Sequence, residues 1–504
     1  MEPDAPSLTS AQELRNRLGI GLAAVVAAAG WALTLIVLVR GGGYKETIVD
    51  LVPALPLAMI GTVTALAAWK RSVDIAVWLG VLVALGIGIN LVVVWLLFRG
   101  DTWGQLIPPD PIWGRDFRDG LYDPARVFSV EGSGWPPLTL IVAWPLTLVQ
   151  RSTAYAVEVG LMAGAAVGSA ILSAVLAVRA VGSGPSRSET GVHGAVDAQS
   201  LGIVLGIWLL TSYGFMYELQ RGNVNLFALF FSLLAVWLAV RLPHSPWWPA
   251  ILLAVAINLK LYPAILLVLL FWRYRLRAVV PVLVANAVLL LVAGPANSWR
   301  LLVWLTTVTP ASRVATYGDM GAAGTAAILR ATTTWAPPWI ALPLFVVPVA
   351  LWSATAVVLI RRGWSGRRAV VLAAASVPPM ALVPTLSNDY KLVLFVFPLA
   401  VLAAAFAGSG LDRGRIGWCL GFGVVAWLLV FMARSTGFHG WGLVGSKYSL
   451  AVLAQVVLLV VAWRLDAARV ERRAAVREDD GGRPRVADPG DVHPVLDGTG
   501  EAMT

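Results

Sequence analysis

Long runs of apolar residues, separated by short polar segments, dominate the chain. A helix needs about 20 apolar residues to cross a bilayer, and the pattern predicts twelve such crossings. They lie near 18–39, 50–69, 75–98, 154–178, 200–217, 224–240, 278–294, 338–360, 369–386, 392–408, 416–433 and 448–463. The pattern therefore predicts an all-α polytopic membrane protein.

The segment 246–273 breaks this pattern because Asn258, Lys260, Tyr262 and Pro263 divide it into two short apolar runs. A single crossing would place the arginines at 273–277 outside and reverse every later span against the positive-inside rule. We therefore expect a hairpin of two short helices that enters and leaves from the cytoplasmic side, with Lys260 at its tip. Such a broken structure is tolerated at membrane depth only inside protein or around a water-filled cavity.

Composition and charge support this reading. The chain has 504 residues, of which 58% are hydrophobic and 13% charged, with a mean hydropathy of +0.77. This excludes a soluble enzyme. The net charge of +10 does not indicate nucleic-acid binding, because Lys and Arg sit at the ends of apolar runs and concentrate in the segments that alternation places inside. The orientation that follows has the N-terminus in the cytoplasm of a plasma-membrane protein.

The polar segments divide the chain into regions. We expect a three-span region at 1–98, an outer loop with an interfacial helix at 99–153, a transmembrane bundle at 154–465 with a second outer loop at 295–337, and a disordered cytoplasmic tail at 466–504. The single cysteine, Cys419, excludes a disulfide framework and a thiolate metal cluster. The sequence has no Walker motif, no zinc-ligand spacing and no nucleophile elbow, and we expect neither a metal nor another cofactor.

Acidic residues are dense in the first long loop. Asp101 directly follows a predicted span, so its carboxylate should lie at the rim of the bundle, where it can deprotonate an alcohol or, equally, cap a helix. Asp116 is the second candidate. The other acids stand beside Pro, Gly or Arg and are better explained by turns and ion pairs. The apolar run at 135–149, too short to cross, should lie in the interface as an amphipathic helix that contacts lipid or simply covers the bundle.

Three polar clusters interrupt the remaining apolar sequence. Glu218, Gln220, Arg221, Asn223 and Asn225 gather before an outer helix start, where an Arg and free backbone amides can bind phosphate. Lys260, without an acid nearby in the sequence, needs an anion such as a lipid phosphate, a distant acid or snorkelling to water. Asp389, Tyr390 and Lys391 stand at an outer span boundary, as substrate contacts or as an interface anchor.

The order of these features resembles glycosyltransferase family 87 of the GT-C class, the membrane glycosyltransferases of actinobacteria that use polyprenyl-phosphate sugars. The resemblance rests on an Asp after a span, "GLYDP" (120–124), "WPPLTLIVAWPL" (135–146), "QRGNVN" (220–225) and "NLKLYPAILLVLLFWRYR" (258–275). It covers roughly 99–408. The chain departs from the family in two spans added before the loop and in the Gln-Arg-Gly order.

This resemblance implies a GT-C-type helical bundle that transfers a sugar, preferably mannose, from a polyprenyl-phosphate donor to a glycolipid or cell-envelope polysaccharide outside the membrane. The family's base, an Asp of the first outer loop, is carried by position to Asp101, then to Asp116. Lys260 and Arg221 would hold the donor phosphate. The residues expected to contact the substrates are Gln220, Asn223, Asn225, Tyr262, Tyr122, Asp389, Tyr390 and Lys391.

Other readings of the same sequence stay open. The donor may instead carry arabinofuranose. A lipid-linked-sugar flippase or exporter would share the broken helices and the buried Lys260, but would have no use for an acid-rich outer loop. A scaffold for a wall-synthesis complex would bind no sugar lipid at all.

Overall fold

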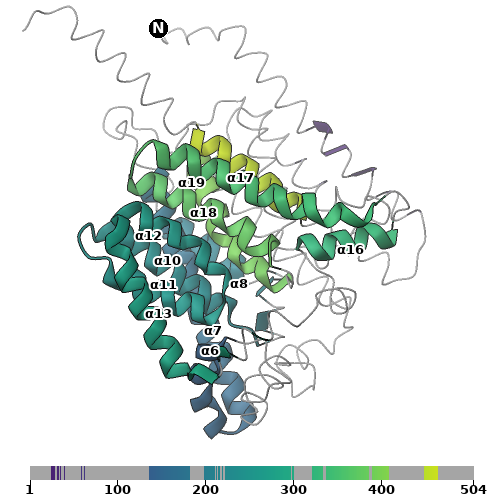
Figure 1. The fold of residues 1–504 in the computed structure, drawn as a ribbon. Coiled ribbons are helices and arrows are strands. Elements are labelled where there is room, and N and C mark those ends of the chain that lie inside the picture. Colours follow the sequence, from purple (N-terminus) through teal and green to yellow (C-terminus); the bar gives the residue numbers. More distant parts are fainter. Residues whose placement is uncertain are drawn as a thin grey trace, which may run out of the picture. The chain divides into compact units, whose positions relative to one another are not determined.

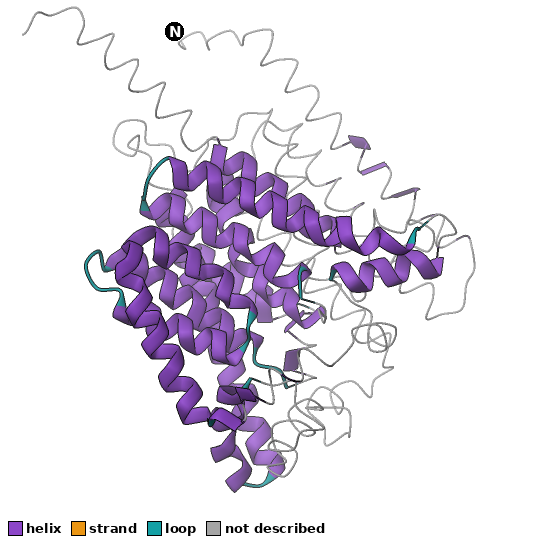
Figure 2. Ribbon diagram, in the orientation of Figure 1, coloured by secondary structure: helices purple, strands orange, loops and turns teal. Residues whose placement is uncertain are grey.

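The computed structural model describes the helical part of the chain that carries most of the polar clusters (Figure 2). The continuous described stretches are 136–181, 198–210, 222–296, 321–332, 336–384, 389–407 and 448–463, with single residues and short pieces elsewhere, among them Glu218 and Leu219. The predicted regions 1–98 and 466–504, and most of 99–153, lie outside these residues. The chain divides into two compact units, Met1–Ala462 and Trp463–Thr504, and everything below concerns the first.

All regular elements among the described residues are helices, as the apolar runs predict (Figure 1). The α-helices are α6 (Pro137–Ala143), α7 (Arg151–Val181), α8 (Ala198–Leu210), α10 (Asn225–Arg241), α11 (Trp247–Leu259), α12 (Leu267–Tyr274), α13 (Val279–Ala293), α16 (Ala322–Thr332), α17 (Ala341–Arg361), α18 (Gly366–Leu382) and α19 (Val396–Ala407). The 3-10 helices are η2 (Trp144–Leu148), η4 (Tyr262–Leu266), η5 (Arg275–Ala278), η6 (Pro338–Ile340) and η7 (Asp389–Phe395). A last apolar helix covers Tyr448–Trp463.

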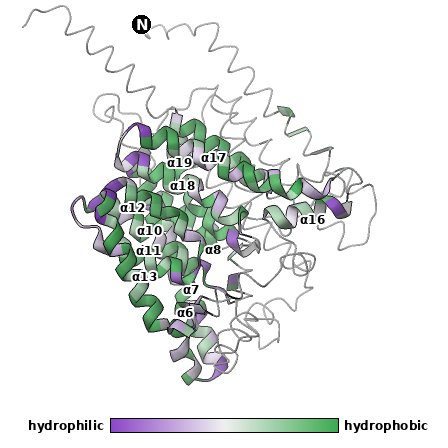
Figure 3. Ribbon diagram, viewed as in Figure 1, coloured by the Kyte–Doolittle hydropathy of each residue, from purple (hydrophilic) through white to green (hydrophobic). Residues whose placement is uncertain are grey.

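Among the residues that the structure describes, three helical stretches are long and apolar enough to cross a membrane: Arg151–Ala180, Tyr262–Val292 and Pro338–Arg361. Hydrophobic residues make up most of the length of the helices, and hydrophilic ones lie mainly near helix ends and connections (Figure 3). Helices suit this setting because they satisfy their backbone hydrogen bonds internally, which lipid cannot do for them. The chain is an all-α membrane protein.

The segment 246–273 forms the two helical pieces that the sequence predicts. Helix α11 ends at Leu259, and Lys260 then takes an extended conformation (φ −149°, ψ 133°). The chain continues through η4 and α12, and the Tyr274 hydroxyl at the end of α12 donates to the Leu242 carbonyl over 2.6 Å. Because Leu242 follows α10 and precedes α11, the second piece returns to the end of the bundle where the first one begins. Lys260 therefore lies at the far tip of a hairpin.

Arginines collect where this hairpin begins and ends. The Arg273 guanidinium lies 4.9 Å from the ring centroid of Trp364, in the connection between α17 and α18. Arg367 donates to the carbonyl of Ala180, near the end of α7, and Arg368 donates to the carbonyl of Gly363 over 3.0 Å. We call this region, which joins the ends of α7, α10, α12 and α17 to the start of α18, the basic end.

Close packing holds the helices that frame the opposite end. Helix α7 packs against α8, α10 and α19, and α10 packs against α11. Between α7 and α10 the approach is tight, since a Cβ added to Gly168 would lie 2.7 Å from the Phe230 ring. Helix α18 is buried along its whole length from Ala369 to Leu382. This rigid frame fixes the start of α10, the tip of the hairpin and η7 relative to one another.

Candidate active site

The first turn of α10 is capped by an acid that precedes it in the chain. The Glu218 carboxylate accepts hydrogen bonds from the backbone N–H groups of Asn225 (2.7 Å) and Leu226 (3.3 Å). A carboxylate satisfies the free donors of a helix N-terminus and is favoured by the helix dipole. Glu218 has no exposed surface, so the cap is fully enclosed by protein.

A tight turn brings this carboxylate back to the helix. The Glu218 carbonyl accepts hydrogen bonds from the N–H groups of Gly222 (2.9 Å) and Asn223 (3.3 Å). Gly222 has a φ of 62°, in the left-handed region that glycine enters without the Cβ clash of other residues. The glycine predicted to allow a tight turn does so here.

Asparagine and tyrosine side chains extend the cap into a network. The Asn225 amide donates to Glu218 Oε2 over 2.9 Å and to Asn223 Oδ1 over 3.0 Å. Its own carbonyl oxygen accepts from the Tyr262 hydroxyl over 2.9 Å. Asn223 and Asn225 are buried, with 2% and 0% of their surface exposed. The network therefore ties the start of α10 to the hairpin, just beyond Lys260.

Two lysines flank this network. Lys391 of η7 is 4% exposed, and its Nζ lies 5.6 Å from the ring centroid of Tyr262. Lys260 lies at the hairpin tip, and its charge acts on Glu218. Burial raises the pKa of the Glu218 carboxyl to about 7, while the Asn225 amide and the positive charge of Lys260 hold it down. Glu218 is thus an acid within electrostatic range of Lys260, whereas the alternatives left open for Lys260 stay predictions.

The short helix α6 and helix α7 complete the walls. The Thr139 hydroxyl donates to the Leu259 carbonyl over 3.1 Å, and Leu138 packs with Ala228 and Leu259. From α7, the Tyr155 hydroxyl donates to the Leu219 carbonyl over 2.6 Å. The other face of α6 and η2 exposes Val142, Trp144 and Leu148. Helix α6 therefore packs against the end of α11, beside the hairpin tip, while the interfacial position predicted for this run stays a prediction.

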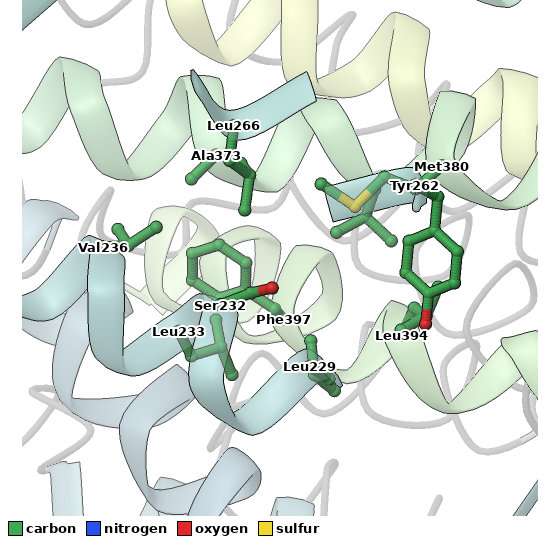
Figure 4. Close-up of a pocket in the computed structure, with 11 residues that line it drawn as sticks. Leu229, Ser232, Leu233, Val236, Tyr262, Leu266, Ala373, Met380, Leu394 and Phe397 are labelled. Atoms are coloured by element: carbon green, nitrogen blue, oxygen red, sulfur yellow. The ribbon is translucent and has the colours of Figure 1, made fainter. Parts of the chain in front are cut away.

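A narrow apolar cavity shares one residue, Tyr262, with the network (Figure 4). Tyr262 belongs to both, since its ring lines the cavity while its hydroxyl bonds to Asn225. The remaining lining residues come from α10, η4, α18, η7 and α19: Leu229, Ser232, Leu233, Val236, Leu266, Ala373, Val377, Met380, Leu394 and Phe397. The Ser232 hydroxyl donates to the Ala228 carbonyl, so the lining offers little to a polar group.

Several candidates lie outside the described residues: Asp101, Asp116, Tyr122, Gln220 and Arg221. The backbones of Asp389 and Tyr390 belong to η7, next to Lys391. Of the sequence-predicted residues, the structure brings together Asn223, Asn225, Lys260, Tyr262 and Lys391. Among the residues it describes, no group of three or more His, Cys, Asp and Glu is placed to hold a metal ion.

Sequence reasoning underrated three contributors. Glu218 was part of a predicted cluster but was not selected as a site residue, although it is the centre of the network. Thr139 and Tyr155 carry no sequence signal because each acts through a contact with a distant backbone carbonyl. A fourth group, Glu158, is a 4% exposed acid inside the apolar helix α7, and its position in an apolar run was a signal that could have marked it.

The comparisons with known proteins agree with this geometry. The family model of glycosyltransferase family 87 matches residues 135–387, just over half of the chain. The matched range runs from α6 past the end of α18 and holds Glu218, Asn225, Lys260 and Tyr262, while Lys391 lies shortly after it. Searches of curated proteins and of solved structures gave no match. The chain belongs to glycosyltransferase family 87 and is a membrane glycosyltransferase.

Proposed function

We propose that the protein transfers a sugar, preferably mannose, from a polyprenyl-phosphate donor to a glycolipid or cell-envelope glycan on the outer face of the plasma membrane. The observation that carries this proposal is the position of Tyr262, which follows Lys260 by two residues, has its ring centroid 5.6 Å from the Lys391 Nζ and lines an apolar cavity. An anionic head group attached to an apolar chain is the kind of ligand that combines these two needs. Transfer of a sugar within family 87 is established by the family match, whereas the donor, the sugar and the face are our proposal.

The orientation follows from the arginines. The basic end gathers Arg273, Arg367 and Arg368, and basic residues are retained on the cytoplasmic side. The network of Glu218 and Asn225 lies at the other end of α10, whose 17 residues span about 25 Å at 1.5 Å per residue. This separation supports an active site that opens toward the outer face.

In the proposed reaction, the acceptor hydroxyl attacks the anomeric carbon while the bond from that carbon to the phosphate oxygen breaks. The electron pair of this bond stays on the phosphate, and the acceptor proton passes to a carboxylate. We assign the base to Asp101, with Asp116 as second choice, and the phosphate contacts to Lys260 and Arg221. A single displacement inverts the anomeric centre. Fixed cations stabilise the charge that develops on the leaving phosphate, and a general base contributes about 10²–10⁴-fold.

The remaining predicted residues complete this picture as substrate contacts. We propose that Gln220, Tyr122, Asp389 and Tyr390 surround the sugar and the acceptor, and that Asn223, Asn225, Tyr262 and Lys391 shape the donor side. A phosphodiester carries one negative charge, so the two lysines suffice to bind it and the mechanism needs no metal ion.

The test is transfer of radiolabelled sugar in membranes. Polyprenyl-phosphate-mannose and polyprenyl-phosphate-arabinofuranose are supplied in parallel to wild type, Asp101→Ala and Asp116→Ala at equal protein level. We expect label from the mannose donor to enter glycolipid with wild type and to be lost with one of the two variants. If only polyprenyl-phosphate-arabinofuranose gives label in glycolipid, the transferred sugar is arabinofuranose and not mannose. Binding without transfer of either sugar would favour a flippase. Full activity in both variants would exclude these aspartates as the base.

A further inference from the structure

The buried acid of the site has no part in the reaction as described above, yet its carboxylate is held by several hydrogen bonds. Glu218 accepts three hydrogen bonds, two on Oε1 from backbone N–H groups and one on Oε2 from the Asn225 amide. A helix can be capped by a neutral Ser, Thr or Asn next to its first turn. Burying a charge for this purpose is costly unless the charge itself is needed.

The group that needs this negative charge is Lys260, at the hairpin tip. Lys260 ends α11 in an extended conformation, and a lysine is a point charge on a flexible stem. Its ammonium group can serve a phosphate only if something fixes its position. The carboxylate of Glu218, itself anchored to α10 and Asn225, lies beside the hairpin tip, because Tyr262, two residues after Lys260, donates to the same Asn225.

Both carboxylate oxygens are already engaged as acceptors, and protonation would weaken the bonds that cap α10. Glu218 therefore acts through its neighbours. Resting on the proposed function, we propose that Glu218 is a positioning residue of the donor-phosphate site, which fixes Lys260 and Asn225 beside the phosphate and limits how tightly the phosphate product is held. The product matters because the donor is a singly charged diester, whereas the polyprenyl phosphate left after transfer is a monoester that carries more negative charge at pH 7.

The proposal predicts in which direction loss of the negative charge on Glu218 changes turnover, donor binding and product inhibition. Glu218→Gln keeps the shape and an acceptor oxygen but removes the negative charge, so the site becomes more positive. We expect kcat to fall at least tenfold because the phosphate is no longer fixed. The KM for the donor should not rise, and polyprenyl phosphate should inhibit at a concentration at least threefold lower. Glu218→Asp, which keeps the charge, should restore part of kcat.

The experiment measures sugar transfer, inhibition by polyprenyl phosphate, direct binding of polyprenyl phosphate and thermal unfolding of purified wild type, Glu218→Gln and Glu218→Asp. Asn286→Ala is the matched control, since it removes a partly buried hydrogen bond between α11 and α13, which the Asn286 side-chain oxygen accepts from the Asn258 amide over 2.9 Å. This control should lower thermal stability with kcat and the inhibition constant unchanged.

The outcomes separate the inference from the proposed function. A Glu218→Gln variant whose kcat stays within twofold of wild type, or whose activity falls only in proportion to folded protein, overturns the inference. So does weaker binding of polyprenyl phosphate by this variant. If wild type transfers no sugar but Glu218→Gln binds polyprenyl phosphate more tightly, the charge role of Glu218 stands and the proposed reaction fails. If wild type neither transfers nor binds, both fail.

Discussion

The hydroxyl of Tyr262 donates a hydrogen bond to the side-chain oxygen of Asn225 over 2.9 Å. This bond joins the hairpin to the first turn of α10, two segments that lie 37 positions apart in the chain. It also joins the two halves of the proposed donor site, because Tyr262 lines the apolar cavity and Asn225 belongs to the polar network.

Removing the Tyr262 hydroxyl tests this link between the hairpin and α10. Tyr262→Phe leaves the Asn225 oxygen buried without its donor, which costs about 1–3 kcal/mol. The ring that lines the cavity and faces Lys391 is retained. We expect a lower unfolding temperature together with transfer reduced about tenfold, measured on protein purified in detergent. Unchanged transfer in a destabilised variant would show that the bond serves the fold alone.

The charge of Lys260 should be needed for donor binding. Lys260→Met removes the ammonium group with little change in volume, so the KM for the donor should rise at least tenfold. Lys260→Arg keeps the charge and should retain part of the affinity, although its planar group differs from an ammonium. Transfer kinetics at varied donor concentration give both values, and an unchanged donor KM for Lys260→Met would contradict the assignment.

Lys260 and Glu218 should also show coupling. If the carboxylate acts through the lysine, the effects of the two substitutions are not additive. The double variant Glu218→Gln with Lys260→Met should lose less activity than the product of the two single losses. A double-mutant cycle on kcat measures this, with Asn286→Ala in place of Glu218→Gln as the uncoupled pair, for which simple multiplication is expected.

Activity should rise with pH through the titration of Glu218. Burial raises the pKa of this carboxyl from its ordinary 4.5 to about 7, against the Asn225 amide and the charge of Lys260. The ionised form caps α10 and fixes Lys260, so transfer should fall as the pH drops below about 7. The pH–rate profile of Glu218→Gln should lack this step, and a step that persists belongs to another group.

The same titration affects stability with the opposite sign. Because the folded carboxyl holds its proton more tightly than the unfolded one, its contribution to stability is fully present below pH 4.5 and is lost as the pH rises through about 7. As the pH rises over this interval, the unfolding temperature of wild type should therefore fall relative to that of Glu218→Gln. Thermal unfolding of both proteins in one buffer series from pH 5 to about 8 provides the comparison.

The turn at Gly222 should tolerate no Cβ. Its φ of 62° costs an alanine about 1–2 kcal/mol, and its N–H bonds to the Glu218 carbonyl. Gly222→Ala should lower the unfolding temperature and displace the cap. Gly160→Ala is the control, since a Cβ there meets nothing within 4 Å and α7 gains helix propensity. Equal unfolding temperatures for the two variants would be incompatible with this account.

The fold followed from the sequence because membrane helices depend on local composition. The apolar runs at 154–178 and 338–360 correspond to α7 and α17, and the arginines at 273–277 identified the hairpin through a charge rule that needs no contacts. The sequence also marked Lys260 and Asn225, since polar groups in apolar surroundings are conspicuous.

The partners of these groups could not be predicted in the same way. No local rule links Glu218 to Lys260 or Thr139 to the Leu259 carbonyl, because each pair meets only after the helices have packed. The sequence pointed instead to the loop acids Asp101 and Asp116, which lie outside the described residues. Those assignments stay predictions.

The length of the hairpin of α11, η4 and α12 determines the position of Lys260 at its tip. Both of its legs are attached to the chain at the basic end, where Tyr274 meets Leu242, and Lys260 is carried at the free tip. The 13 residues of α11 rise about 20 Å at 1.5 Å per residue, so leg length fixes the depth of Lys260. Lengthening or shortening a leg by one residue would shift the lysine by about 1.5 Å and turn it by about 100°, and so the length of the two legs sets the distance of Lys260 from the basic end.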